Sequence, residues 1–213
     1  MPGLRTDGGR GPSIVPTLAA ALVLSAACAF PAWANPSTQD PAKVPAGAYV
    51  LDKRHASLTV RILHMGFSHY TLRFDGLDGS FTYDPADWQA TRATFTVDPK
   101  SVDTSDTAFD RQIAGYFEPE KYPVISFVST DVQGQDGKGA MSGDLTFHGV
   151  TRRVTLDLTF AGAGHGVAPL GTRLGFSGST RIKRSDFGLS NFILNQFTSD
   201  DVEVIFEVEF EKK

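Results

Sequence analysis

The sequence contains a single cysteine, Cys28, which lies in an apolar N-terminal stretch rather than in the body of the chain. If that stretch is removed on export, the remaining chain has no thiol, which excludes disulfides, thiol catalysis and Cys-ligated metals. Basic runs are absent too: the 213 residues carry a net charge of −4, and no cluster of Lys and Arg offers a face for nucleic acid. The composition therefore favours neither a disulfide scaffold nor a nucleic-acid-binding protein.

Signatures of catalysis and metal binding are missing as well. The five histidines form neither an i, i+2 pair on a strand nor an H-E-x-x-H helix, so the sequence predicts no metal site and no cofactor. A phosphate-binding glycine loop and a G-x-S-x-G turn are also lacking. Asp52 and His55 are close enough along the chain to hydrogen-bond. Because no nucleophile accompanies them, we interpret the pair as a lock on strand register, with an acid/base pair as the alternative.

The first 34 residues have the organisation of a secretory signal peptide. Arg5 and Arg10 give a positive start, residues 14–30 are apolar, and an Ala-Trp-Ala triplet ends at Ala34. We therefore expect cleavage after Ala34 and export to the periplasm. Two alternatives stay open: an uncleaved membrane anchor, for which the apolar run is short, and a lipoprotein acylated at Cys28.

The remainder of the chain predicts a leader and one domain. Residues 35–46 hold three prolines among small and polar residues, which is typical of a flexible leader. Residues 47–213 are long enough for a domain with a sizeable core. Hydrophobic residues make up 41% of the chain, and the 16 phenylalanines outnumber tyrosine and tryptophan together. We therefore expect a core rich in phenylalanine.

Residues 55–67 form the longest stretch with one apolar face at the two-residue period of a β-strand. The apolar positions of this face are Ala56, Leu58, Val60 and Ile62. Continuing the alternation puts His64 on the same face and makes the opposite face apolar at Leu63, Met65 and Phe67. We therefore expect the far end of this strand to be covered on both sides. His64 is either a core histidine with both nitrogens hydrogen-bonded or a polar group that orients an apolar ligand.

The same alternation recurs along the rest of the domain. Further strands are expected at residues 80–83, 92–98, 124–130, 140–147, 150–160, 172–183 and 201–211. Residues 103–117 instead carry apolar side chains at helical spacing and predict one short helix against the sheet. One apolar face per strand favours antiparallel pairing, and hence a barrel or sandwich of about eight strands. Periodicity does not decide whether such a barrel is filled by side chains or holds one ligand.

An arginine in the segment Arg184-Ser-Asp-Phe-Gly is a second polar candidate. Its guanidinium could hold an anionic head group with two hydrogen bonds. Asp186, two residues further on, could instead neutralise it. We favour a structural role for Arg184.

Several short motifs follow one another along the chain: GAYVLD at 47–52, HAS at 55–57, LHMGF at 63–67, DGSF at 78–81, SVDT at 101–104, YFEPEKYP at 116–123, GDLTFHGVT at 143–151, RSDFG at 184–188 and DVEV at 201–204. Their order resembles that of the YceI-like family of bacterial polyisoprenoid-binding proteins. No single motif is specific, but the ordered set spans essentially the whole expected domain. The resemblance departs mainly in the loops, notably at residues 162–171.

The resemblance implies an all-β fold, an eight-stranded antiparallel lipocalin-like barrel with one short helix, often exported to the periplasm. Its lumen would take a long isoprenoid such as a polyprenyl phosphate or an isoprenoid quinone, with no catalytic residue or required metal. Positions carried over from the family and the inward phase of the strands give the expected ligand contacts. These are Leu58, Val60, Ile62, His64, Phe81, Phe95, Val97, Phe127, Phe147, Phe176, Arg184 and Phe187.

We therefore hypothesise a non-catalytic periplasmic protein that carries or stores an isoprenoid lipid. One alternative is a prenyl-lipid hydrolase or isomerase that uses Asp52, His55 or His64. The other is a filled structural barrel that acts through its surface in stress response. Transient contact with a membrane and pairing of two barrels into a homodimer both stay open.

Overall fold

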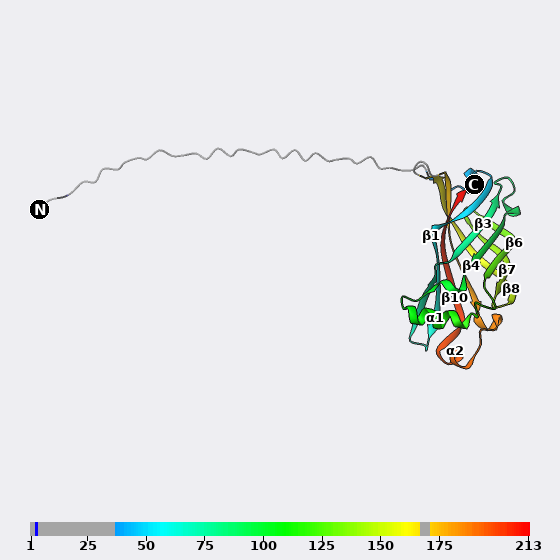
Figure 1. Ribbon diagram of the computed structural model, residues 1–213. Coiled ribbons are helices and arrows are strands. Elements are labelled where there is room, and N and C mark those ends of the chain that lie inside the picture. The colour runs from blue at the N-terminus through cyan, green and yellow to red at the C-terminus, as the bar shows by residue number, and fades with distance from the viewer. Residues whose placement is uncertain (1–2, 4–36, 167–170) are drawn as a thin grey trace. The chain divides into compact units, whose positions relative to one another are not determined.

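The computed structural model describes Gly3 and residues 37–166 and 171–213 (Figure 1). The expected signal peptide, except for Gly3, and the lipoprotein alternative at Cys28 therefore lie outside the described residues. Residues 1–33 and 34–213 form separate units, and the description below concerns the second.

Eight antiparallel strands close into a barrel in the order β1-β3-β4-β6-β7-β8-β9-β10, and β10 pairs back onto β1. The ten strands of the described residues are β1 Gly47–His64, β2 Ser68–Phe74, β3 Leu77–Tyr83, β4 Arg92–Val97, β5 Val102–Asp103, β6 Ile125–Gln135, β7 Lys138–Phe147, β8 Val150–His165, β9 Thr172–Lys183 and β10 Thr198–Lys212. The predicted eight-stranded barrel is confirmed.

Two short α-helices lie at the end of the barrel opposite the C-terminus (Figure 1). They are α1, Thr107–Tyr116, and the six-residue α2, Phe192–Phe197, which the sequence did not predict. The 3-10 helices are η1 Pro41–Lys43, η2 Trp88–Ala90, η3 Pro99–Ser101 and η4 Arg184–Phe187. Among the helices described, none has the length and apolarity needed to cross a membrane.

Strand β1 changes its partner along its length. Its first residues, 47–50, pair with β3, whereas residues 58–64 pair with β2. The turn between β1 and β2 has positive φ at Met65 (52°) and Gly66 (75°), and the Phe67 amide donates to the His64 carbonyl at 2.9 Å. This is the geometry of a tight hairpin turn, but methionine is an unusual residue for it. The sequence prediction missed β2 for that reason and extended the preceding strand through the turn.

Helix α1 covers the side of the barrel where β2 has replaced β3. Asp106 caps the helix by accepting from the amides of Ala108 and Phe109, so the helix begins at Thr107, within the predicted segment 103–117. Helix α1 contacts β2 on one side, and Phe117, the residue after the helix, contacts β7 on the other. Phe109 packs on Tyr70 of β2, with ring centroids 5.6 Å apart, and Phe117 packs on Phe147 of β7 at 5.5 Å.

The segment expected to be a flexible leader packs on the other end of the barrel. Thr38 and Ala163 exchange both backbone hydrogen bonds, at 2.7 and 2.8 Å. Val44 is buried, and the Tyr83 hydroxyl donates to the Pro41 carbonyl at 3.0 Å. The described part of the leader is therefore held by contacts distant in sequence, which a local reading of its prolines could not anticipate.

The far end of β1 is not covered on both sides, so that prediction is wrong. On the lumen side the strand is half-buried, but Met65 is 47% exposed and Phe67 is 81% exposed. The reason is that the chain turns at these residues and projects beyond the barrel instead of continuing as a strand. The Met65 amide donates to the Phe197 carbonyl at 2.9 Å, so the turn lies beside α2.

Candidate functional site

The lumen of the barrel contains two adjoining cavities. The first, here called the α1 chamber, has a volume of about 430 Å³ and lies beneath α1, between β1, β2 and β10 on one side and β6 to β8 on the other. The second, the leader chamber, has a volume of about 720 Å³ and lies beneath residues 39–44. Both are lined by Phe95, Leu156, Phe206 and Val208, which form the waist between them. The lumen is therefore not filled by its own side chains.

The wall of the α1 chamber is almost wholly apolar. Leu58, Val60 and Ile62 supply it from β1, because alternate residues of a strand face one side of the sheet. Helix α1 adds Phe109 and Ile113, which lie one helical turn apart on the same face. Such a wall suits a hydrocarbon chain and offers few hydrogen-bonding groups to anything else.

The leader chamber is apolar inside and polar at its margin. Phe81, Phe176 and Phe210 gather in its wall, with ring centroids of Phe81 and Phe210 4.9 Å apart in an edge-to-face arrangement. Gln133 and Lys138, from the hairpin between β6 and β7, contribute polar side chains to its lining.

Eleven of the twelve predicted ligand contacts line these two chambers. Those in the α1 chamber are Leu58, Val60, Ile62, His64, Phe95, Val97, Phe127, Phe147 and Arg184, and those in the leader chamber are Phe81, Phe95 and Phe176. Phe187 lines neither chamber. It is buried behind Phe147, with ring centroids 5.7 Å apart, because η4 turns it away from the lumen. Contact of the other eleven with a ligand stays a prediction.

Arg184 is buried and is bonded chiefly to backbone. Its guanidinium donates to the carbonyls of Ser199 at 3.0 Å and Leu189 at 2.6 Å, and to Oδ1 of Asn195 at 3.0 Å. Among the described residues it forms no ion pair with Asp186 or any other carboxylate. Arg184 therefore ties η4, α2 and β10 together at the end of the α1 chamber through backbone carbonyls and Asn195, not through the pairing with Asp186 that the sequence suggested.

A carboxylate near Arg184 carries a shifted pKa. Burial raises the pKa of Asp200, but two hydrogen bonds from Ser185 and the positive charge of Arg184 outweigh burial, so the pKa lies below its ordinary value. Asp200 thus stays ionised beside η4 and accepts from the Ser185 amide at 2.9 Å and its hydroxyl at 2.7 Å.

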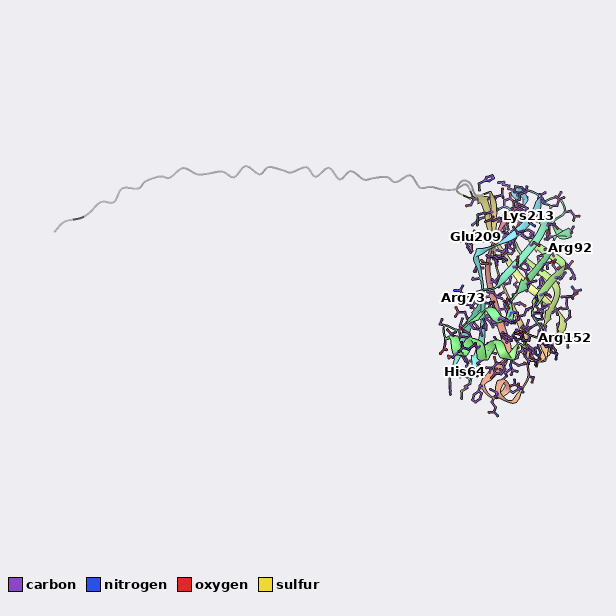
Figure 2. The ribbon with its side chains drawn as sticks, viewed as in Figure 1. His64, Arg73, Arg92, Arg152, Glu209 and Lys213 are labelled. Atoms are coloured by element: carbon purple, nitrogen blue, oxygen red, sulfur yellow. The ribbon has the colours of Figure 1, made fainter. Side chains whose placement is uncertain are left out.

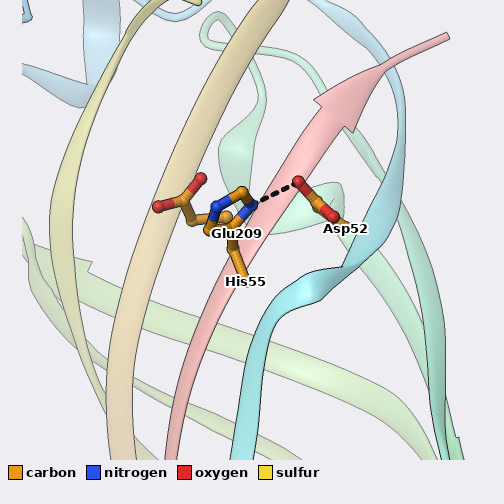
Figure 3. Close-up of side chains that lie close together, drawn as sticks. All are labelled: Asp52, His55 and Glu209. Carbon is orange, nitrogen blue, oxygen red and sulfur yellow. Dashed lines mark hydrogen bonds and ion pairs between the residues drawn. The ribbon is translucent and has the colours of Figure 1, made fainter.

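Asp52 and His55 lie outside both chambers, in an ionic cluster on β1, β9 and β10 (Figure 3). His55 Nδ1 is 2.7 Å from Asp52 Oδ2, as the sequence predicts. Arg173 forms ion pairs with Asp52, Glu209 and Glu211. The pairing of β1 with β10 shifts between Leu51 and Ala56, so the cluster spans an irregularity in the ladder. This placement favours the register lock.

The ionic cluster lowers the pKa of Asp52. Burial raises the pKa of Asp52, but hydrogen bonds from His55 and Arg173 outweigh it, so the pKa lies far below its ordinary value. Asp52, His55 and Glu209 also place ligand atoms within 4.8 Å of one another, as a metal would require. The Arg173 guanidinium already pairs with both carboxylates of that group, so a cation bound there would stand beside a fixed positive charge, which disfavours it.

The sequence prediction missed several lining residues. Tyr83 and Trp88 line the leader chamber beside Pro41 and Val44, and Tyr116 lines the α1 chamber. For the helix a signal existed in the spacing of Phe109, Ile113 and Phe117. For the leader no local signal existed, since its burial depends on contacts with β8 and Tyr83.

A family model described as the YceI-like domain matches residues 49–210. The chain belongs to the YceI-like family. A UPF0312 protein of Vibrio cholerae is 37% identical to it over 149 residues, which cover 68% of this chain and 78% of the relative. Among solved structures, BcnA of Burkholderia cenocepacia matches this YceI-like protein with a TM-score of 0.66 and 24% identity, covering 75% of this chain and 98% of BcnA. A polyisoprenoid binding domain from Saccharophagus degradans matches with a TM-score of 0.59 and 23% identity, covering 78% of this chain and 98% of that domain. At these identities the two structures show a shared fold.

Proposed function

We propose that this YceI-like protein binds a long-chain isoprenoid lipid in its barrel and carries or stores it in the periplasm without altering it chemically. The observation that carries the proposal is the pair of apolar chambers that meet at one waist along the lumen. A compact ligand needs one pocket, whereas two chambers in line suit a chain of repeated apolar units. The Saccharophagus degradans domain, described as polyisoprenoid-binding, supports the same ligand class.

Burial of an isoprenoid chain contributes enough free energy to account for binding. Burial of a CH₂ group contributes about 0.8 kcal/mol, so one five-carbon isoprene unit contributes roughly 3–4 kcal/mol before ordering costs. A few units reach micromolar affinity, about −8 kcal/mol, after those costs. The tail therefore supplies the affinity, and polar groups at the chamber wall such as His64 orient the head group. A polyprenyl phosphate and an isoprenoid quinone are both compatible with this arrangement.

Two observations weigh against the alternatives. Of the three residues considered for catalysis, His64 alone lines a chamber, and a single histidine without a nucleophile or second acid/base group makes a poor hydrolase. The volumes of the chambers weigh against a filled barrel. If the wild-type protein turned over a prenyl phosphate and His64→Ala did not, the enzymatic alternative would replace the proposal. The periplasmic location rests on the organisation of residues 1–34.

The test is a binding titration with short and long prenyl alcohols, geranyl and solanesyl, solubilised in detergent. Leu156→Trp, at the waist, should weaken binding of the long chain at least about tenfold and leave the short chain less affected, because only the long chain needs both chambers. Val128→Trp, at an exposed position of β6 outside both chambers, is the matched control for added bulk. Failure of the wild-type protein to bind either alcohol would contradict the proposal.

A further inference from the structure

One end of the barrel carries most of the exposed large apolar side chains of the described residues. We call residues 63–70 and 188–199, the β1–β2 turn and the segment around α2, the tip. Met65 and Phe67 are 47% and 81% exposed there, and Ile193 and Phe197 are 52% and 43% exposed. Of the large hydrophobic residues found exposed in the described chain, only Val124 and Val128 lie elsewhere. Single exposed apolar residues are ordinary, but four gathered on one end indicate a contact surface.

The two segments of the tip form one surface. His64 pairs with Thr198, and the Met65 amide donates to the Phe197 carbonyl at 2.9 Å. The Leu63 amide also donates to the Ser199 hydroxyl at 3.2 Å. These bonds hold the β1–β2 turn beside α2, so the exposed side chains of both segments lie at the same end of the barrel (Figure 1).

The tip is free of Asp, Glu, Lys and Arg. None of these residues occurs at positions 63–70 or 188–199, although the whole chain contains 20 Lys and Arg and 24 Asp and Glu. The polar residues of the tip are serine, threonine, asparagine, glutamine, tyrosine and the histidines His64 and His69. A surface without carboxylates avoids repulsion by anionic lipids, and its amides and hydroxyls can hydrogen-bond to lipid head groups.

The tip is continuous with the α1 chamber. His64, Leu194 and Thr198 line the chamber and directly precede or follow the exposed Met65, Ile193 and Phe197 in the chain. His64 is also exposed to solvent, and Figure 2 shows it at the α1 end of the barrel, opposite Lys213. The chamber wall therefore reaches the outer surface at the tip, and a lipid that leaves the chamber there meets these apolar side chains.

We infer that the tip docks on the surface of a lipid bilayer, with Phe67 and Ile193 inserted among the lipids, so that an apolar lipid passes between the bilayer and the α1 chamber. The part of this inference that concerns lipid passage rests on the proposed function. A bilayer is a better occupant than a protein, because a stable protein interface is centred on clustered anchors that fill well-packed pockets of the partner. The tip offers four apolar side chains on a narrow turn and a six-residue helix.

The test compares the wild-type protein with the double variant Phe67→Ser/Ile193→Ser. Neither residue lines a chamber, and both side chains are more than half exposed, so the barrel should fold and melt as the wild type does. Val128→Ser is the matched control, since Val128 is 49% exposed on the outer wall of β6. The probe is vesicles of phosphatidylethanolamine and phosphatidylglycerol that contain solanesol.

Three readouts separate the two claims: co-sedimentation with vesicles, the rate of solanesol uptake from them, and equilibrium binding of solanesol in detergent. The double variant should co-sediment about tenfold to a hundredfold less and take up solanesol more slowly, because each anchor contributes roughly a factor of ten. Its binding in detergent should equal that of the wild type, and Val128→Ser should match the wild type in all three readouts.

Two results would overturn the inference. One is co-sedimentation and uptake that are equal for the wild type and the double variant. The other is a wild-type dimer that becomes monomeric on Phe67→Ser without any vesicle binding, which would assign the tip to a second copy of the chain. Failure of the wild type to bind solanesol in detergent would contradict the proposed function instead, while vesicle co-sedimentation would still test the docking by itself.

Discussion

The Nη1 group of Arg184 donates to the carbonyl oxygen of Leu189 at 2.6 Å, deep in the wall that closes the α1 chamber. This bond is one of several by which a single buried cation organises the chain between β9 and β10. Because the other acceptors are the carbonyls of Ser199 and Thr198 and the side chain of Asn195, removal of the guanidinium leaves several acceptors without a donor.

Arg184→Ala should lower the free energy of unfolding by about 2–4 kcal/mol, since buried acceptors lose their hydrogen bonds. Arg184→Lys should recover little of this loss, because an ammonium cannot reproduce the planar fork of a guanidinium. Urea denaturation measures both. Arg181→Ala is the control: that exposed side chain pairs with Glu203 at 3.5 Å and should change stability by no more than about 0.5 kcal/mol. Equal stabilities of Arg184→Ala and Arg181→Ala would refute the structural role.

Val60→Asp places a carboxylate on the wall of the α1 chamber, where the surrounding residues are apolar. Stability should fall by about 3 kcal/mol or more, and binding of prenyl alcohols should weaken, because the carboxylate has no partner there. Thermal melting and the detergent titration measure the two effects. Val128→Asp, on the outer wall, should leave both nearly unchanged. The opposite pattern in the two variants would mean that the inner and outer faces have been reversed.

Val44→Ser should loosen the leader from the barrel, because Val44 is buried against the core while the residues on either side of it are exposed. We expect a loss of about 1–3 kcal/mol and faster hydrogen exchange at Thr38 and Ala163, whose amides bond each other's carbonyls. Exchange followed by mass spectrometry measures this. Ala46→Ser, at an exposed position of the same segment, should exchange as the wild type does, and unchanged exchange in Val44→Ser would show that the leader is held by other contacts.

Asp52 should make stability depend on acid pH. Its pKa in the folded protein lies far below the ordinary 3.8, since hydrogen bonds from His55 and Arg173 favour the charged form more than burial opposes it. A depressed folded pKa contributes stability that is present above the unfolded value and is lost as pH falls toward the folded value. The wild type should therefore lose stability below about pH 4 more steeply than Asp52→Asn. Unfolding free energies measured across this range decide the matter, and parallel curves would contradict the assignment.

The alternation of apolar and polar residues along the strands was the sequence feature that best predicted which residues face the lumen. Leu58, Val60 and Ile62 line the α1 chamber because a two-residue period leaves a strand no other way to bury one face. The RSDFG motif predicts Phe187 in the lumen, but the side chain lies behind Phe147. A 3-10 helix has no two-residue period, so strand phase could not be extended into η4.

Other features could not be predicted from the sequence, because they depend on contacts between distant segments. The leader is held by Ala163 and Tyr83, which lie in β8 and β3. The turn at Met65 and Gly66 lacks the Asn-Gly pair that usually marks a hairpin, so β2 was hidden and the exposure of Phe67 was unforeseen. Because Met65 and Phe67 are exposed at the tip, that end of the barrel presents an apolar surface to a partner.

Identification of the lipid that co-purifies with the full-length protein from a bacterial host tests the central claim most directly. Organic extraction of the purified protein, followed by mass spectrometry of the organic phase, should recover an unmodified prenyl lipid in an amount comparable to the protein. Val60→Asp, purified in parallel, should yield much less. Protein that is consistently free of lipid and also fails to bind added prenyl compounds would contradict the account.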